Sequence, residues 1–204
     1  MLLKKMIRIL NNKNVIFMFY ELKNIVNQQH LAYISVLSDE EKDIYNNCDE
    51  SNKKKFVSNS SVIYLPYLSS DMFVEIYKQN DKASYNLTID RIKKIIDIDS
   101  SSEEKIAFVA YIILHEVGHW IHFEEMGKRP YRFAREDSNI RKKVYLEQLN
   151  MKRKLIGKSK LNENEEKDIE KLFYKYHSIP MEKRADEYAD KYLKDFMKLL
   201  KENL

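Results

Sequence analysis

The chain has 204 residues, of which 44% are hydrophobic and 12% aromatic, and its formal net charge is +4. This composition favours one globular domain with a buried core and excludes wholesale disorder. The single cysteine, Cys48, excludes an intramolecular disulfide, and no signal peptide or membrane span is recognised, so a cytoplasmic protein is expected.

The first part of the chain predicts only short elements. Residues 1–37 alternate apolar bursts with Asn and Lys, which fits either strand or helix, and residues 1–55 form a candidate N-terminal extension. Ser38 is followed three residues later by Glu41. This spacing matches a capping box and predicts a short helix.

Two strands are predicted before residue 100. The β-branched and aromatic stretch SSVIYLPYLSS, residues 60–70, predicts a strand that Pro66 either ends or moves to a sheet edge. DMFVEIYKQ, residues 71–79, predicts a short amphipathic helix, and SYNLTI, residues 84–89, a second strand.

The clearest predicted element is a helix over residues 102–126. Ser101 and Glu104 form a capping box at its start, and Gly127 supplies a stop signal at its end. The middle of this helix is apolar on nearly every side, so a central, buried position is expected. Its uninterrupted apolar run, residues 106–114, is too short to cross a bilayer.

The rest of the chain predicts polar helices over residues 132–156, with a stop at Gly157, over residues 162–176, and from Pro180 to the C-terminus. Residues 128–160 contain 12 Lys/Arg and 3 Asp/Glu, so the basic excess is local. The acidic residues that follow could neutralise it in an antiparallel hairpin. Residues 128–176 are therefore expected to form a charged helical insertion within a single domain of residues 1–204.

His115, Glu116 and His119 form an H-E-x-x-H pattern inside the predicted buried helix. Positions i and i+4 share a helix face, so both imidazoles can reach one metal ion. Glu116 lies about 100° around the helix from His115. From there it can act as a general base on a water that the metal activates. Coincidence or a degenerate site is the competing interpretation, although two unpaired histidines would be costly inside a buried helix.

A catalytic zinc needs a third protein ligand, and the stretch SIPMEKRADEYADKYLKDF offers Glu182. Glu182 opens a helix whose Ala185 and Ala189 allow another helix to approach closely. Asp186 lies one turn further on the same face, where it can accept a hydrogen bond from the far nitrogen of a ligand histidine. For Glu182 taken alone, an ordinary surface glutamate is the alternative.

Together, H-E-x-G-H and E-x-x-A-D-x-Y-A resemble the zincin metallopeptidases whose third ligand is a glutamate, and are most similar to the ImmA/IrrE type. The matching positions lie on two helices: His115, Glu116, Gly118, His119, Glu182, Ala185, Asp186, Tyr188 and Ala189. The resemblance implies one zinc ion per chain on His115, His119 and Glu182. It also implies that Glu116 is the general base and that Asp186 orients a ligand histidine.

Three other residues allow two interpretations each. His122 lies about 10 Å along the helix axis from His115, which favours hydrogen bonding in the core over metal ligation. His177 is expected to be a helix-end histidine near the C-terminal dipole, with stabilisation of an oxyanion as the alternative. Tyr188 is expected to pack in the core rather than to take part in catalysis.

The basic segment of residues 128–160 mixes cations with Tyr131, Phe133 and Tyr145. A solvated helix face is the ordinary interpretation, and contact with nucleic acid or an acidic partner is the alternative. A non-catalytic regulatory protein that uses this segment is the competing class of function. Glu116 argues against that class, because a structural zinc site needs no free glutamate beside its ligands.

We therefore expect an α+β, zincin-like fold that is predominantly helical, with a small sheet packed on the helix of residues 102–126. The expected activity is zinc-dependent hydrolysis of a peptide bond in a protein or peptide substrate. An extended substrate would pair with an edge strand of the sheet, for which SSVIYLPYL, residues 60–68, is the candidate.

Overall fold

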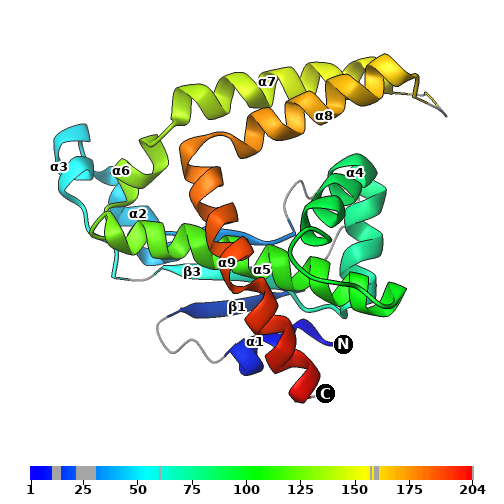
Figure 1. Ribbon diagram of the computed structural model, residues 1–204. Coiled ribbons are helices and arrows are strands. Elements are labelled where there is room, and N and C mark those ends of the chain that lie inside the picture. Colours follow the sequence, from blue (N-terminus) through cyan, green and yellow to red (C-terminus); the bar gives the residue numbers. More distant parts are fainter. Residues whose placement is uncertain (11–14, 22–30, 60, 157, 159–160, 204) are drawn as a thin grey trace.

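The computed structural model of the chain describes residues 1–10, 15–21, 31–59, 61–156, 158 and 161–203 (Figure 1). The described elements are mostly helical and include one small sheet, which confirms the predicted α+β class. In chain order they are α1 (Leu3–Leu10), β1 (Ile16–Tyr20), β2 (Tyr33–Ser35), α2 (Asp39–Asn47), α3 (Glu50–Lys55), β3 (Val62–Pro66), α4 (Ser70–Ile92), α5 (Ser101–Glu125), α6 (Pro130–Arg135), α7 (Ser138–Leu155), α8 (Glu163–His177) and α9 (Pro180–Glu202).

The N-terminal region supplies both helix and strand. Residues 1–37 contain α1, β1 and β2, while residues 11–14 and 22–30 lie outside the described part of the chain. Leu3 and Met6 of α1 are fully buried in the main core. The predicted capping box at the start of α2 is confirmed, since the Ser38 hydroxyl accepts from the Glu41 N–H at 3.1 Å.

The sheet has the strand order β1–β3–β2, with β3 parallel to β1 and antiparallel to β2. Ile63 and Leu65 of β3 are fully buried, and Pro66 ends the strand. The prediction that residues 60–68 supply the edge strand is wrong, because β1 and β2 cover both sides of β3. A buried, β-branched run is typical of a central strand.

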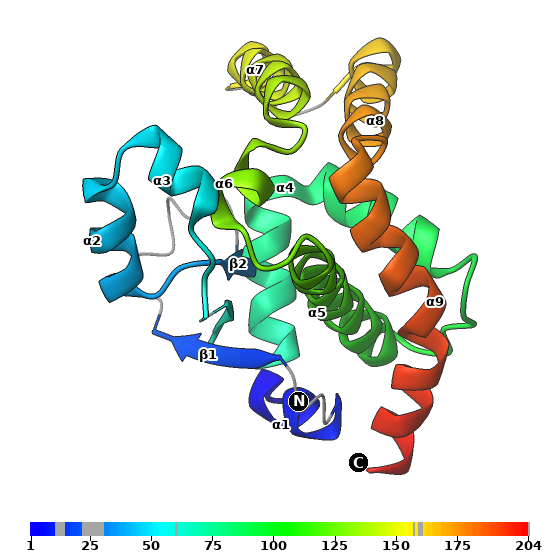
Figure 2. The same cartoon turned by 90° about the vertical axis from the view of Figure 1, so that its left-hand side faces the viewer.

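Helix α5 is the centre of the fold. Figure 2 shows it between the sheet and α9, with α4 behind it. Its predicted position is confirmed, but its cap is Ser100 rather than Ser101: the Ser100 hydroxyl accepts from the Glu103 N–H at 3.1 Å. Gly127 follows the helix at φ 73°, a left-handed conformation that suits glycine.

By length and apolar composition α5 could cross a membrane, yet most of its side chains are buried within the protein. Such burial is typical of the central helix of a soluble core. The fully buried aromatic residues of α5 pack against α4 and the sheet, and the indole of Trp120 donates to Ser61 at 2.6 Å. The buried hydroxyl group of Ser61 thereby has the Trp120 indole as its hydrogen-bond partner.

The prediction of a strand over residues 84–89 is wrong, because this segment is the second half of α4. The helix kinks at Asp81 and restarts there, with the Asp81 carboxylate accepting from the Ser84 N–H at 3.0 Å. The buried residues of the second half recur at helical spacing: Tyr85, Thr88, Ile89 and Ile92. Packing on α5 therefore outweighs the strand preference of β-branched and aromatic residues.

The predicted single helix over residues 132–156 is two helices, α6 and α7, with a break at Asp137. Asp137 adopts a left-handed backbone at φ 54°, and its carboxylate accepts from the Met181 N–H at 3.0 Å. Arg141 stabilises the break by donating to the Ala134 carbonyl at 2.8 Å. A contact with the start of α9, distant in sequence, thus interrupts the helix.

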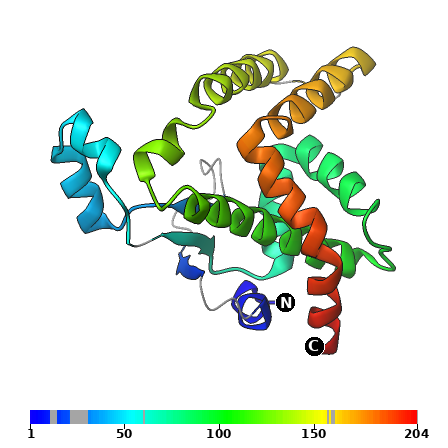
Figure 3. The same cartoon turned by 60° about the vertical axis from the view of Figure 1, so that its left-hand side comes forward.

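Helices α7 and α8 lie side by side as an antiparallel hairpin on one side of the molecule (Figures 1 and 3). The predicted helix over residues 162–176 and the hairpin are confirmed. Glu165 of the acidic stretch pairs with Lys158 of the basic segment, whereas Lys175 of α8 donates to Glu147 of α7 at 2.7 Å. Gly157, the predicted stop, lies outside the described residues.

The predicted last helix is confirmed as α9, which crosses α5 at very short range (Figure 3). A Cβ atom added to Gly118 would lie 2.8 Å from the Ala185 Cα and 3.0 Å from the Ala185 carbonyl oxygen. Real Cβ contacts are longer, so only glycine fits at this position of α5. Ala185 and Ala189 are both fully buried at the crossing.

Gly118→Ala should therefore destabilise the protein by about 1–3 kcal/mol, because the added methyl group overpacks the crossing. The direction of the change in stability is diagnostic, since Gly→Ala in a helix interior otherwise stabilises a protein by up to about 1 kcal/mol. Urea unfolding followed by circular dichroism measures the difference. Ser102→Ala, at the exposed start of α5, is the control and should change stability little. Unchanged or raised stability in Gly118→Ala would contradict the close crossing.

Candidate metal centre

The crossing of α5 and α9 brings the three predicted ligands together. The Glu182 Oε2 atom lies 3.4 Å from the Nε2 atom of His115 and 3.3 Å from the Nε2 atom of His119. One ligand atom from each residue lies within 4.8 Å of the others. His119 and Glu182 are buried, and His115 is half-buried. These three residues could hold a metal ion.

The donor set fits a zinc ion. Ligand atoms about 2.1 Å from a tetrahedral zinc lie about 3.4 Å apart, which matches the two measured N–O separations. Within the described residues, the buried Oε2 atom of Glu182 makes no hydrogen bond of ordinary geometry. A buried carboxylate oxygen without a partner is costly unless a cation satisfies it.

The start of α9 is set by contacts that precede Glu182. Pro180 occupies the first turn, where its missing N–H costs nothing, and Ile179 offers no side chain as a cap. The Asp137 carboxylate therefore caps α9 from another part of the chain, through the Met181 N–H. Met181 packs in a small buried cluster with Phe123 of α5. These contacts fix the first turn of α9 and with it the direction of the Glu182 side chain.

Asp186 is fully buried one turn after Glu182 and accepts hydrogen bonds at both oxygens. His115 Nδ1 lies 2.9 Å and the Tyr111 hydroxyl 3.1 Å from Oδ1. His177 Nδ1 and Arg91 Nη1 each lie 2.7 Å from Oδ2. When a metal is bound, the Nδ1–H group of His115 donates to Asp186, so the Nε2 atom can direct its lone pair to the metal position between His115, His119 and Glu182.

The two buried carboxylates of the site attract positive charge, which without a metal ion is the proton on His115 that a bound metal would displace. Burial opposes a charge on His115, but the hydrogen bond to Asp186 and the nearby Glu182 outweigh it and raise the pKa of His115 to about 10. Burial would raise the pKa of Glu182 and of Asp186, yet their histidine partners hold both values far below the usual range. Two buried carboxylates thus stay ionised beside the histidines, as a cation site requires.

Glu116 lies on the same turn of α5 but outside the ligand group. Burial raises its pKa, which favours proton uptake by this carboxylate. The backbone N–H of Ile34 in β2 hydrogen-bonds its carboxylate. Glu116 therefore lies between the metal-ligand group and the edge strand β2.

His122 is buried in a separate network away from the ligand group. Arg184 donates to its Nδ1 atom at 2.9 Å, and its Nε2 atom pairs with Glu136. The expectation of core hydrogen bonding agrees with this placement. His177 is the last residue of α8, as expected, with one ring nitrogen on Asp186. Tyr188 packs beside Tyr192 against the main core.

Sequence reasoning missed three residues that surround this centre. Arg91 and Tyr111 bind Asp186, and Tyr176 approaches Glu182 through its hydroxyl. Burial and the neighbouring Glu182 raise the pKa of Tyr176 well above its usual range, so the hydroxyl stays protonated. In the sequence, the only feature that could have indicated Tyr176 is its position directly before His177.

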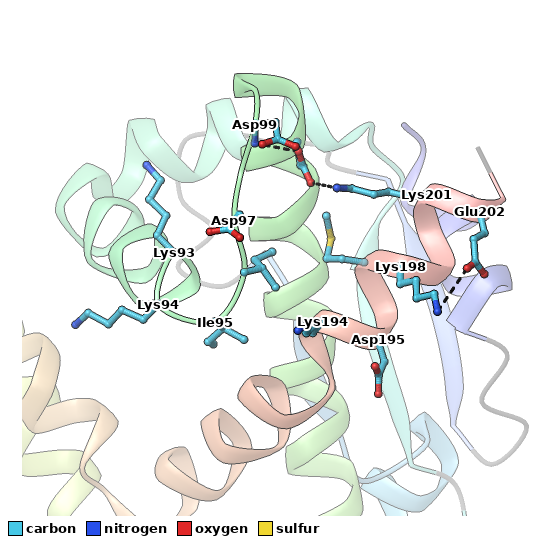
Figure 4. A pocket seen from close by; sticks show the side chains of 13 residues that line it. Lys93, Lys94, Ile95, Asp97, Asp99, Lys194, Asp195, Lys198, Lys201 and Glu202 are labelled. Atoms are coloured by element: carbon cyan, nitrogen blue, oxygen red, sulfur yellow. Dashed lines mark hydrogen bonds and ion pairs between the residues drawn. The ribbon is translucent and has the colours of Figure 1, made fainter.

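A surface pocket of about 800 Å³ lies elsewhere, between the segment after α4 and the C-terminal half of α9 (Figure 4). Both lysines and carboxylates line it, and the Nζ atom of Lys201 lies 2.5 Å from Oε1 of Glu103. None of the residues that line it belongs to the metal-ligand group.

No protein-family model matches the sequence, and no curated protein or solved structure is significantly similar to the chain.

Glu182→Ala should abolish stable zinc binding, because two histidines alone leave an incomplete tetrahedral site. Plasma mass spectrometry of the purified proteins should find about one zinc per chain in the wild type and in Glu116→Gln. Glu187→Ala, an exposed glutamate on the next turn of α9, is the control and should retain zinc. Full zinc content in Glu182→Ala would rule out the assigned ligand set.

Proposed function

We propose that this protein is a zinc-dependent metallopeptidase with a zincin-like catalytic centre. The observation that carries the proposal is a three-residue ligand group, His115, His119 and Glu182, with a free glutamate on the same helix turn. Structural zinc sites are closed by four protein ligands, whereas three ligands leave a position for water or substrate. Glu116 has no use in a structural site but has one in hydrolysis.

A zinc ion held by this group would lower the pKa of a water molecule and polarise the carbonyl of a peptide bond. Glu116 then takes a proton from the attacking water and passes it to the leaving amine. Burial raises the pKa of Glu116, which favours uptake of the proton in the first step. The hydrogen bond from Ile34 holds the carboxylate in place during the transfer.

Tyr176 is proposed beside His177 as a donor to the oxyanion. The Nδ1 atom of His177 lies 2.7 Å from Asp186, which orients the ring and leaves its opposite nitrogen for such a role. The Tyr176 hydroxyl is buried close to Glu182, and the charge of Glu116 also acts on it. A neutral hydroxyl beside both carboxylates is placed to donate where negative charge develops.

The edge strand β2 is the proposed support for an extended substrate. Its one partner among the described strands is β3, and it contacts α5 where Ile34 bonds Glu116. An extended peptide can add to such an edge through main-chain hydrogen bonds. A peptide bond paired near Ile34 would lie beside the general base, which supports a protein or peptide substrate.

The exposed cations of α7 support a second proposal, an acidic partner or nucleic acid bound on this face. Lys142, Lys143, Arg153 and Lys154 are all exposed on α7. This binding does not require the metal centre and would be the main function if zinc does not bind. For either function, the buried α5 and the free Cys48 support a cytoplasmic location.

Glu116→Gln should lower peptide hydrolysis by about 10²–10⁴-fold while zinc stays bound, because only the general base is lost. A peptide library with mass-spectrometric detection of new termini measures cleavage without a known substrate. Glu125→Gln, exposed at the end of α5, is the matched control and should cleave as the wild type does. Cleavage by Glu116→Gln at the wild-type rate would refute its role as base.

Tyr176→Phe should lower kcat by about 10²–10³-fold, because one donor to the oxyanion is removed. The phenyl ring keeps the packing, so the fold and zinc content should persist. Tyr174→Phe changes an exposed tyrosine on the same helix and serves as the control. If kcat in Tyr176→Phe equals that of the wild type on a peptide identified by the library, the hydroxyl has no such role.

A further inference from the structure

Helix α9 carries three acidic residues at successive four-residue intervals, and each has a different partner. Glu182 belongs to the metal-ligand group, Asp186 accepts from His115, and Asp190 binds Arg91. Residues four apart lie on one face of a helix. The three carboxylates therefore form a row that leads from the metal centre towards α4.

Arg91 joins the last two members of this row, Asp186 and Asp190. Its Nη1 atom donates to Asp186 Oδ2 at 2.7 Å. Its Nε and Nη2 atoms donate to the two Asp190 oxygens at 3.0 and 2.7 Å, a bidentate geometry that only arginine provides. The guanidinium also lies 5.9 Å from the centre of the Tyr111 ring.

The backbone of Arg91 is firmly placed. It lies in the last turn of α4, flanked by the buried Ile89 and Ile92, whose side chains belong to the main core. The side chain of Arg91 therefore reaches Asp190 from a fixed backbone position on α4. The side chain of Arg91 is 29% exposed and that of Asp190 35%, whereas that of Asp186 is 1% exposed.

Arg91 is the one partner of Asp186 whose charge is permanent. The other donors to Asp186 among the described residues are two imidazole nitrogens and one hydroxyl. A metal-ligating histidine is neutral, so His115 cannot balance the buried carboxylate once a metal is bound. Beside the metal ion, the guanidinium is then the permanent positive charge that holds the Asp186 carboxylate in its orientation towards His115.

We propose that Arg91 is a positioning residue of the metal centre, held by Asp190 and acting through Asp186 on the orientation of His115. This inference rests on the proposed metal site and extends it to α4. Groups that orient a ligand histidine typically change metal affinity about 10–100-fold when they are lost. Arg91→Met should therefore raise the zinc Kd by about that factor.

The test measures zinc Kd by competition with a chromophoric chelator, for wild type, Arg91→Met and Asp190→Asn. Asp190→Asn releases the bidentate hold on Arg91 at a partly exposed position, so the fold should survive and the loss of affinity should be smaller. The visible spectrum of the cobalt(II)-loaded proteins reports the geometry at the metal and should shift in both variants. Thermal unfolding shows whether each variant is folded.

Two controls match the variants. Arg184→Met removes an arginine of α9 that contacts His122, and Asp195→Asn neutralises an exposed aspartate of the same helix. Both should retain the wild-type Kd and cobalt spectrum. If Arg91→Met does not fold, Asp190→Asn decides the question by the same two measurements.

The outcomes separate the two proposals. Tight zinc binding by the wild type, with the same Kd and spectrum in the folded variants, overturns the role of Arg91 and leaves the metal site intact. No zinc binding by the wild type overturns the proposed function and, with it, this inference. Weaker binding and a shifted spectrum in the variants but not in the controls support the positioning role.

Discussion

The close crossing of α5 and α9 is the constraint on which the candidate metal centre depends. A glutamate side chain is short, so Glu182 can meet the two histidines of α5 only if the helix backbones nearly touch. Gly118 allows this approach, because any side chain there would collide with the backbone of Ala185. The glycine and the alanine therefore matter for the chemistry, although neither has a functional group.

The same crossing gathers ionisable groups inside the core, where isolated charges are strongly unfavourable. The protein offsets this cost by pairing each group. Asp186 accepts four hydrogen bonds, and the charge of Arg91 balances it. Glu182 has no comparable set of donors, and its Oε2 atom faces both histidines. This difference between the two carboxylates is the physical reason for placing a cation beside Glu182 and not beside Asp186.

Segments distant in sequence complete the site around this crossing. The strand β2 fixes Glu116, the end of α8 brings Tyr176, and α4 brings Arg91. The charged segment between the two motif helices thus contributes more than a basic surface. Its break at Asp137 caps the start of α9, and its last helix, α8, places Tyr176 beside Glu182.

The sequence by itself determined the two motif helices, the capped α2, the helix α8 and the shared face of His115 and His119, because helical periodicity and capping are local patterns. It indicated Glu182 through the pairing of two motifs. Only the tertiary structure decided the central place of β3, the helical state of residues 84–89 in α4 and the positions of Arg91 and Tyr176 beside the site. These features arise from contacts between residues far apart in the chain. Local propensity cannot show which strand is covered on both sides, or which arginine reaches a buried aspartate.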